Sequence, residues 1–407
     1  MTPDALDAAD PLAHFRDRFA LPEGVIYLDG NSLGALPKAT EARVLETVRR
    51  EWGEGLITSW NKAGWVGMPQ RIGDKIARLI GAGEGEVIAC DSTSVNVFKA
   101  LAAAVALRPE RSVILSESGN FPTDIYIMQG IEALTGRQVR AQMVQPDEIE
   151  GAIDDSVAAV LLTQVHYKTG RMRDMARITK LAQERGALMI WDLSHSAGAI
   201  PVDLTGANAD FAVGCGYKYL NGGPGAPGFL YVAERHQNDV TPALTGWFGH
   251  SAPFAFEDRY APAPGIARFL VGTPPVLGMA ALEVGVDLFL EADLAAVRAK
   301  SLSLSQLFIE EMTPLAERWG FVLASPADPA ERGSQVSYRH PEGYAIMQAL
   351  IARRVIGDFR APDILRFGFT PLYTTHVEVA AAVDHIEAVM AAGEWDRPEY
   401  KVRSAVT

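Results

Sequence analysis

Residues 187 to 232 read ALMIWDLSHSAGAIPVDLTGANADFAVGCGYKYLNGGPGAPGFLYV. This stretch holds three short apolar runs, at 187–192, 210–215 and 228–232, separated by polar and glycine-rich turns. The first two runs are nearly continuous in apolar residues, which is typical of strands that are covered on both faces. The stretch therefore predicts the centre of a mainly parallel sheet in an α/β domain.

Two residues of this stretch could carry chemistry. Asp192 ends the first strand, and Lys218 lies just past the end of the second, 26 positions later. Because carboxyl ends of parallel strands face one ligand crevice, both side chains should point into it. Taken alone, a strand-end Asp is most often a cap, and a lone Lys is most often a solvated charge. Together they suit a pyridoxal phosphate enzyme, in which a lysine forms the Schiff base and a carboxylate keeps the pyridine nitrogen protonated.

The same alternation continues upstream. Further strands are expected at 112–116, 139–144 and 157–163, with helices at 95–107, 124–134 and 174–185. The segment Asp91-Ser92-Thr93-Ser94-Val95-Asn96 lies where the first of these helices should begin. Its hydroxyls and backbone N–H groups favour an anion such as phosphate. An ordinary N-cap explains the same residues equally well when they are considered alone.

Downstream of a Gly- and Pro-rich stretch at 262–275 the pattern changes. A long helical region at 277–319 precedes strands at 335–339, 355–359 and 364–369 and helices at 343–353 and 377–391. The chain has 407 residues, more than the ~250 to 300 at which single cores stop growing. We therefore expect an N-terminal segment (1–45) that packs on the domains, a large cofactor-binding α/β domain (46–275) and a small α+β domain (276–407).

Composition excludes several functions. Lys plus Arg is 37 and Asp plus Glu is 50, so the net charge of −13 opposes nucleic acid and anionic membranes as partners. Only Cys90 and Cys215 are present, which indicates a reducing compartment, and the acidic N-terminus does not resemble a signal peptide. The longest apolar run, 269–282, is interrupted by two prolines, and the eight histidines lack metal-site spacing. We expect a cytoplasmic protein without a membrane span or a metal.

Seven motifs carry a resemblance that covers nearly the whole chain. They are LDGNSLG (28–34), DSTSVN (91–96), NFPTD (120–124), WDLSH (191–195), GYKYLNGGPG (216–225), GWFGH (246–250) and RFGFTPLY (366–373). Their order resembles bacterial-type kynureninases, which are fold-type I pyridoxal phosphate enzymes of the class V aminotransferase superfamily. The resemblance implies a large domain with a mainly parallel sheet sandwiched by helices, and a smaller α+β C-terminal domain.

The resemblance also implies roles in cofactor binding. Lys218 would form the Schiff base, Asp192 would pair with the pyridine nitrogen, and Phe121 would stack on the ring. Tyr217 is counted with Lys218 and Asp192 as catalytic. The remaining cofactor contacts would come from Thr93, Ser94, Tyr217 and Trp247 at the phosphate, and from Asp124, Thr163, His195 and Thr273. His195 lies three positions after Asp192 and could hydrogen-bond that carboxylate.

For the substrate, the resemblance makes Arg366 the group that receives the α-carboxylate, and a planar fork suits a bidentate contact. Ser32, His250 and Thr273 would complete the substrate pocket. Relatives that prefer the 3-hydroxylated substrate carry an amide residue in place of Thr273, which favours unsubstituted kynurenine here.

The implied activity is hydrolysis of the Cβ–Cγ bond of L-kynurenine, which gives anthranilate and L-alanine. The resemblance also allows 3-hydroxykynurenine as a substrate. This reaction belongs to tryptophan catabolism, the kynurenine pathway and NAD biosynthesis. The implied assembly is a homodimer with active sites at the subunit interface. An aminotransferase would share Lys218, Asp192 and Arg366. A cysteine desulfurase is disfavoured because no cysteine follows Cys215, and a regulatory protein on this fold is disfavoured by the intact set of three residues.

Overall fold

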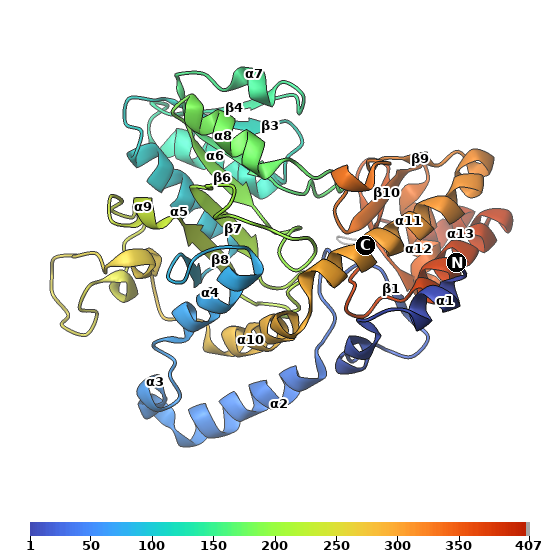
Figure 1. Cartoon of the computed structure of the whole chain (residues 1–407), viewed down its shortest axis with the longest axis horizontal. Coiled ribbons are helices and arrows are strands. Elements are labelled where there is room, and N and C mark those ends of the chain that lie inside the picture. Colours follow the sequence, from blue (N-terminus) through green and yellow to red (C-terminus); the bar gives the residue numbers. More distant parts are fainter. Residues whose placement is uncertain (404–407) are drawn as a thin grey trace.

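The computed structural model describes residues 1–403. A seven-stranded sheet forms the centre of one half of the molecule, and a four-stranded sheet forms the centre of the other half (Figure 1). The strands of the larger sheet are β2 (Val87–Ala89), β3 (Val113–Glu117), β4 (Arg140–Val144), β5 (Val157–Thr163), β6 (Leu188–Asp192), β7 (Phe211–Cys215) and β8 (Gly228–Val232). Their order is β2-β8-β7-β6-β5-β3-β4.

Helices cover both faces of this sheet. Val160 and Leu162 of β5 belong to one apolar cluster, together with residues of α4 (Met68–Leu79), α8 (Met175–Glu184) and α10 (Val276–Glu291). Ala159 and Leu161 of the same strand belong to another cluster, with residues of α5 (Thr93–Ala106) and α6 (Pro122–Leu134). Because alternate side chains of β5 face opposite layers, a doubly covered strand is apolar throughout, as the sequence predicted.

The expectation of a mainly parallel sheet is confirmed, with two corrections. The strand at 228–232 is β8, which runs antiparallel to both of its neighbours, β7 and β2. Its connection from β7 contains no helix, whereas a parallel connection needs a crossover of a dozen or more residues. Strand β2 was not predicted, because a three-residue strand leaves no readable periodicity.

The small sheet has the order β12-β13-β10-β9. Its half consists of α11 (Leu294–Trp319), β9 (Val322–Leu323), β10 (Gln335–Arg339), α12 (Gly343–Ala352), β11 (Val355–Ile356), β12 (Asp358–Arg360), β13 (Ile364–Gly368) and α13 (His376–Ala391). The helical region at 277–319 divides where Asp293 caps α11. The single strand expected at 355–359 is wrong, because β11 pairs with β1 (Ile26–Tyr27) and β12 pairs with β13.

The N-terminal segment contacts both halves. Helix α1 (Pro3–Ala8) packs on α13, and α2 (Lys38–Glu46) lies along α10 (Figure 1). A π-helical stretch (Thr47–Glu54) and α3 (Ser59–Lys62) then lead to α4. The division into residues 1–45, 46–275 and 276–407 stays a prediction.

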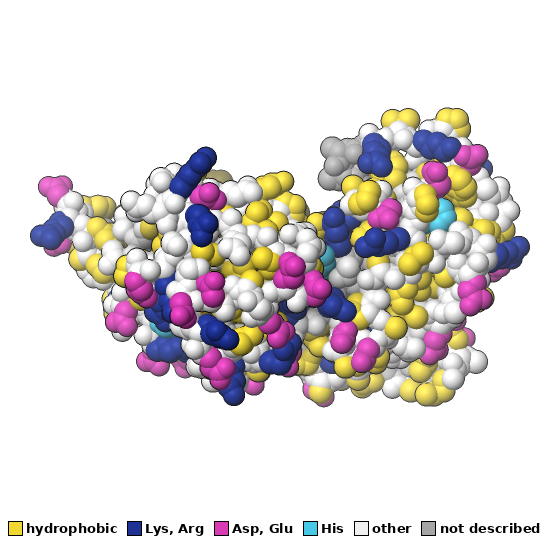
Figure 2. Space-filling model, turned by 90° about the horizontal axis from the view of Figure 1, so that it is seen from above, with side chains coloured by type: hydrophobic (Ala, Val, Ile, Leu, Met, Phe, Trp, Pro, Cys, Tyr) yellow, Lys and Arg dark blue, Asp and Glu magenta, His cyan; other side chains and the backbone are white. Residues whose placement is uncertain are grey.

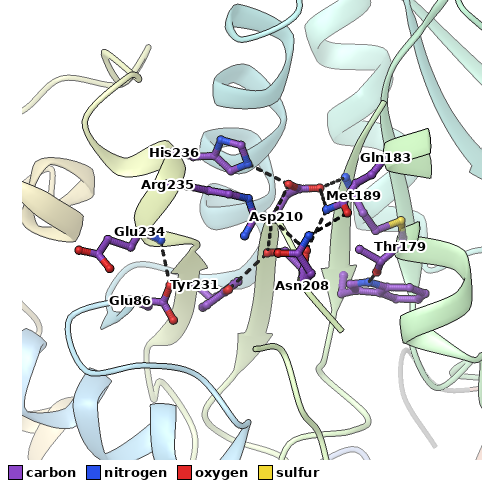
Figure 3. Close-up of polar contacts among 12 residues, drawn as sticks. Glu86, Thr179, Gln183, Met189, Asn208, Asp210, Tyr231, Glu234, Arg235 and His236 are labelled. Atoms are coloured by element: carbon purple, nitrogen blue, oxygen red, sulfur yellow. Dashed lines mark hydrogen bonds and ion pairs between the residues drawn. The ribbon is translucent and has the colours of Figure 1, made fainter. Parts of the chain in front are cut away.

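A polar cluster ties the large sheet together at the end opposite the expected site. Asp210 precedes β7 and is 2% exposed. Its carboxylate accepts hydrogen bonds from Met189 N (2.9 Å) and Arg235 Nη2 (2.7 Å), and it lies 2.8 Å from His236 Nε2 (Figure 3). Burial alone would raise the pKa of Asp210, but the hydrogen bonds from His236, Met189 and Arg235 outweigh it and lower that pKa. The cluster therefore stabilises the ionised carboxylate and joins β6, β7 and α9 (Glu234–Gln237).

The outer surface is mixed in charge. Figure 2 shows acidic and basic side chains interspersed on the visible face, which is hollowed between the two halves. Among residues 1–403, no helix is long and apolar enough to span a bilayer.

Candidate active site

The candidate site lies at the carboxyl edge of the large sheet. Thr163 ends β5 and Asp192 ends β6, and the two are paired in register. Lys218 follows the end of β7 by three positions. A cavity of about 280 Å³ opens here, lined by Ser92, Thr93, Ser94, Phe121, Thr123, Thr163, Tyr167, Asp192, Ser194, His195, Tyr217 and Lys218. Eight of the sequence-predicted residues therefore meet in one pocket.

One end of the pocket is the start of helix α5. Ser92 caps this helix by accepting a hydrogen bond from Val95 N at 3.4 Å, and Thr93 and Ser94 follow in the first turn. The turn packs tightly on β8, because a Cβ at Gly228 would lie 3.1 Å from Thr93 N. The N–H groups and hydroxyls in the first turn of a fourteen-residue helix suit a phosphate.

Three buried acceptors lie near one another at the carboxyl edge of the sheet, and two of them, Thr163 and Asp192, line the pocket. Asp192 accepts from Ser194 N at 2.7 Å, while both carboxylate oxygens of Asp124 and the hydroxyl of Thr163 have no hydrogen-bond partner among the described residues. Burial raises the pKa of Asp192, and burial together with the charge of Asp192 raises that of Asp124 well above its usual value. A cationic N–H donor stabilises the ionised form of a carboxyl in such surroundings, so the residues present fit a protonated pyridine ring.

Lys218 also lines this pocket. Its Nζ is 3.0 Å from His195 Nε2, 5.6 Å from the ring centre of Phe121 and 5.9 Å from that of Tyr217. Burial, followed by the charge of Lys218, lowers the pKa of His195 well below its usual value, so the imidazole is neutral. His195 does not hydrogen-bond Asp192 as expected. Its Nδ1 lies 3.0 Å from Gln335 Oε1, since the ring points toward the small sheet.

Arg366 of β13 lies beyond this pocket and is 2% exposed. Its Nη1 donates to the carbonyl of Tyr167 at 2.6 Å, its Nε donates to Asp358 at 2.6 Å, and its Nη2 donates to Ser32 Oγ at 2.9 Å and to Asp358. A guanidinium has five N–H donors, so one remains for a ligand. The expected bidentate grip by Arg366 alone is therefore wrong in this arrangement. Arg360, which also pairs with Asp358 at 2.7 Å, provides a second guanidinium beside it.

Three predicted residues lie away from the pocket of this chain. Trp247 is 41% exposed and packs on Phe248. Both ring nitrogens of His250 are used within its own loop, by Ala252 N at 2.9 Å and the carbonyl of Arg259 at 3.2 Å. Thr273 lines a separate apolar groove of about 480 Å³ with Trp52, Trp60 and Trp65.

Sequence reasoning missed Tyr167, Gln335 and Asp358. Asp358 had a signal: it lies directly across from Arg366 in the antiparallel pair β12–β13, and opposite charges favour such positions. Tyr167 and Gln335 act through their backbone or amide groups, and nothing in their local sequence indicates which side chains they meet.

The fold and the pocket define the class as fold-type I pyridoxal phosphate enzymes. The structure is similar to the cysteine desulfurase CsdA from Escherichia coli (TM-score 0.77, 20% identity, 94% of this chain and 98% of that chain). It is also similar to the cysteine desulfurase from Thermococcus onnurineus NA1 (TM-score 0.76, 18% identity, 96% and 99%). A C-DES mutant with glycine covalently linked to its PLP cofactor matches with TM-score 0.76 at 17% identity, covering 91% and 98% of the two chains.

The sequence relatives are more specific. Residues 297–386 match the kynureninase C-terminal domain, and residues 64–213 match the DegT/DnrJ/EryC1/StrS aminotransferase family. Kynureninases from Burkholderia pseudomallei and Pseudomonas fluorescens are each 52% identical over 99% of this chain and 98% of theirs. The chain belongs to the kynureninase family. The expected family, fold, pyridoxal phosphate cofactor and hydrolase activity on carbon–carbon bonds are thereby confirmed.

Proposed function

We propose that this protein hydrolyses L-kynurenine to anthranilate and L-alanine, with Lys218 and Asp192 as its catalytic pair and Tyr217 beside them. The observation that carries these roles is that Lys218 and Asp192 line one buried pocket whose wall, at Tyr167, is hydrogen-bonded to Arg366. A covalent anchor, a partner for the ring nitrogen and a group for the α-carboxylate thus lie together.

When bound, pyridoxal phosphate supplies an electron sink that stabilises negative charge at the substrate Cα. Asp192 keeps the ring nitrogen protonated, because an ionised carboxylate in a desolvated site favours a cationic partner. Lys218 moves the proton at Cα as general base and then as acid. His195, neutral and 3.0 Å away, accepts a hydrogen bond from Lys218 and holds that amine in place. Phe121 would cover the ring of the cofactor, and Thr93 and Ser94 would hold its phosphate, since all three line the pocket.

Arg366 receives the α-carboxylate together with Arg360, and Ser32 joins the two guanidinium groups. Its Oγ lies 2.9 Å from Arg366 Nη2 and 3.4 Å from Arg360 Nη2. Two guanidinium groups can each give one hydrogen bond to a carboxylate, which replaces the fork of a single arginine. A hydroxyl rather than an amide at Thr273 favours unsubstituted kynurenine over its 3-hydroxy derivative.

The working unit is a homodimer with its active sites at the subunit interface. Trp60 joins the Trp247 region to the Thr273 groove, since its ring lies 6.0 Å from Phe248 and also lines the groove. Exposed apolar side chains surround this region: Trp52, Leu56, Ile57, Phe254 and Phe256. A second copy that covers this face would bring Trp247, His250 and Thr273 to its partner's pocket.

Both cysteines are buried and free, which agrees with a reducing compartment. We place the enzyme in the cytoplasm, in tryptophan catabolism and the kynurenine pathway, whose products can lead toward NAD.

Anthranilate fluorescence on incubation with L-kynurenine tests the proposal, with alanine measured in parallel. We expect equimolar anthranilate and alanine, and slower turnover of 3-hydroxykynurenine. Lys218→Ala should lose turnover and the borohydride-reducible cofactor adduct. Formation of a 2-oxo acid in place of alanine, or an adduct on another lysine, would overturn the assignment.

A further inference from the structure

A continuous set of hydrogen bonds joins the catalytic lysine to the small sheet. Gln335 of β10 is fully buried, its Oε1 lies 3.0 Å from His195 Nδ1, and its Nε2 donates to the carbonyl of Tyr167 at 2.9 Å. The same carbonyl accepts from Arg366 Nη1 at 2.6 Å. The other ring nitrogen of His195 lies 3.0 Å from Lys218 Nζ.

The chemistry of these groups fixes the direction of every bond. A backbone carbonyl can only accept, so the NH₂ group of Gln335 must face Tyr167 and its oxygen must face His195. His195 Nδ1 must then carry the hydrogen. Because burial keeps this imidazole neutral, Nε2 is left with its lone pair toward Lys218, and the ammonium donates to it.

We propose that Gln335 is a positioning residue that sets the tautomer of His195, so that Nε2 is always an acceptor toward the catalytic amine. This inference rests on the proposed role of Lys218. Gln335 belongs to the small sheet and His195 to the loop after β6, so the tautomer depends on the two halves being packed together.

Nitrogen-15 NMR of histidine-labelled protein reads the tautomer directly, both without cofactor and with pyridoxal phosphate. The His195 signal is assigned by its loss in His195→Asn. We expect a protonated Nδ1 and a bare Nε2 in the natural protein. Gln335→Met keeps the length of the side chain but removes the amide, and it should give a mixture of tautomers, a shifted visible absorbance of the bound cofactor and about five- to tenfold lower kcat.

Ser337→Ala is the matched control, because Ser337 lies two positions along the same strand and its Oγ has no partner among the described residues. It should change neither the tautomer nor kcat. If Gln335→Met does not fold, Gln335→Glu tests the proposal instead. Its carboxylate still accepts a hydrogen bond from His195 Nδ1–H, so His195 should keep its hydrogen on Nδ1.

An unchanged tautomer in Gln335→Met, or an Nε2–H tautomer in the natural protein or in Gln335→Glu, overturns the proposal. Borohydride trapping on Lys218 reports separately on the cofactor assignment. If borohydride still traps the cofactor on Lys218 while the His195 tautomer is unchanged in Gln335→Met, the role of Gln335 is refuted and the role of Lys218 is not.

Discussion

The carboxyl of Asp29 is buried near the negatively charged carboxylate of Asp358. Its Oδ1 is buried without a hydrogen-bond partner among the described residues. Burial and the negative charge of Asp358 raise its pKa to about 8, against the lowering effect of Arg366. Burial alone would raise the Asp358 pKa, but the charges of Arg366 and Arg360 and the hydrogen bonds from Arg366 and Ser32 together lower it. One carboxyl of this pair is therefore protonated at neutral pH while the other is ionised.

Asp29→Asn should flatten the dependence of stability on pH. Between the unfolded pKa of about 4 and the folded pKa of about 8, the folded protein holds a proton that the unfolded chain has lost, so its stability falls as pH rises, by up to about 1.4 kcal/mol per pH unit. Asn mimics the neutral acid and removes this contribution. Calorimetric Tm values at pH 5 and pH 8 check it, and an identical pH dependence in both proteins would contradict it.

Arg366→Lys should lower both stability and kcat/KM, whereas Arg360→Lys should lower mainly kcat/KM. Arg366 is fully buried and bonded to Asp358, Tyr167 and Ser32, so Lys at this position loses several hydrogen bonds and should cost about 1 to 3 kcal/mol of stability as well as about tenfold or more in kcat/KM. Arg360 is 35% exposed, and its replacement should lower kcat/KM with little change in Tm. Steady-state kinetics and thermal melts of both variants test this, and equal Tm losses would argue against it.

Local sequence identified Asp192 at the end of β6 and Lys218 just past the end of β7, since parallel topology brings such positions together, whereas Thr163 at the end of β5 was predicted only by the family resemblance. It could not identify Gln335, whose importance depends on how the small sheet packs against the loop after β6. The family resemblance predicted a bidentate contact by Arg366, but Asp358 on the neighbouring strand takes two of its five N–H donors, and Tyr167 and Ser32 take one each.

The NSLG turn supports the loop that carries Lys218. Gly34 N donates to the carbonyl of Tyr217 at 2.8 Å, and a Cβ at Gly34 would lie 2.3 Å from the carbonyl oxygen of Lys218. No side chain fits there unless the backbone of the lysine moves.

Gly34→Ala should therefore weaken cofactor binding by about five- to 150-fold, which is the 1 to 3 kcal/mol typical of overpacking applied to the bound state. Fluorescence titration of the apoprotein with pyridoxal phosphate measures this. Gly130→Ala in α6 is the control, because a Cβ at Gly130 meets nothing within 4 Å. Equal affinities in the two variants would show that the turn does not support Lys218.

Asp210→Asn should destabilise the large sheet without changing the pocket. The lowered pKa of Asp210 means that its contribution is present above pH 4 and is lost as pH falls through the folded pKa. Removing the charge from this partly exposed ion pair, whose Arg235 side chain is 40% exposed, should cost about 1 to 3 kcal/mol at pH 7. Thermal melts from pH 7 to pH 3 should show the two proteins converging, and a constant difference in Tm would exclude the carboxylate as the cause.

Sequence patterns located the long elements better than the short ones. Strands β5, β6 and β7 were predicted because coverage on both faces makes them apolar throughout. The sequence did not separate the two-residue strand β11 from β12. Only Gly357 lies between them, and the two strands differ in the strand each one pairs with, β1 for β11 and β13 for β12.

Mixed variants test the proposed dimer. If Trp247 serves the pocket of its partner, a dimer of one Lys218→Ala chain and one Trp247→Ala chain contains one intact site. Unfolding and refolding an equal mixture of the two weak variants should then restore about a quarter of the natural activity, because half the dimers are mixed and each has one working site of two. No recovery above the sum of the parents would mean that Trp247 acts within its own chain.

Among the described residues, both carboxyl oxygens of Asp124 and the hydroxyl of Thr163 are buried without a hydrogen-bond partner, and this affects how long the protein persists in a cell. A chain that buries such groups is less stable until a ligand satisfies them, and a tightly bound ligand adds several kcal/mol to the folded state. Quality-control proteases degrade chains that unfold more often. The abundance of the enzyme should therefore follow the supply of pyridoxal phosphate, so that scarcity of the cofactor limits the pathway by turnover of the protein as well as by an empty site.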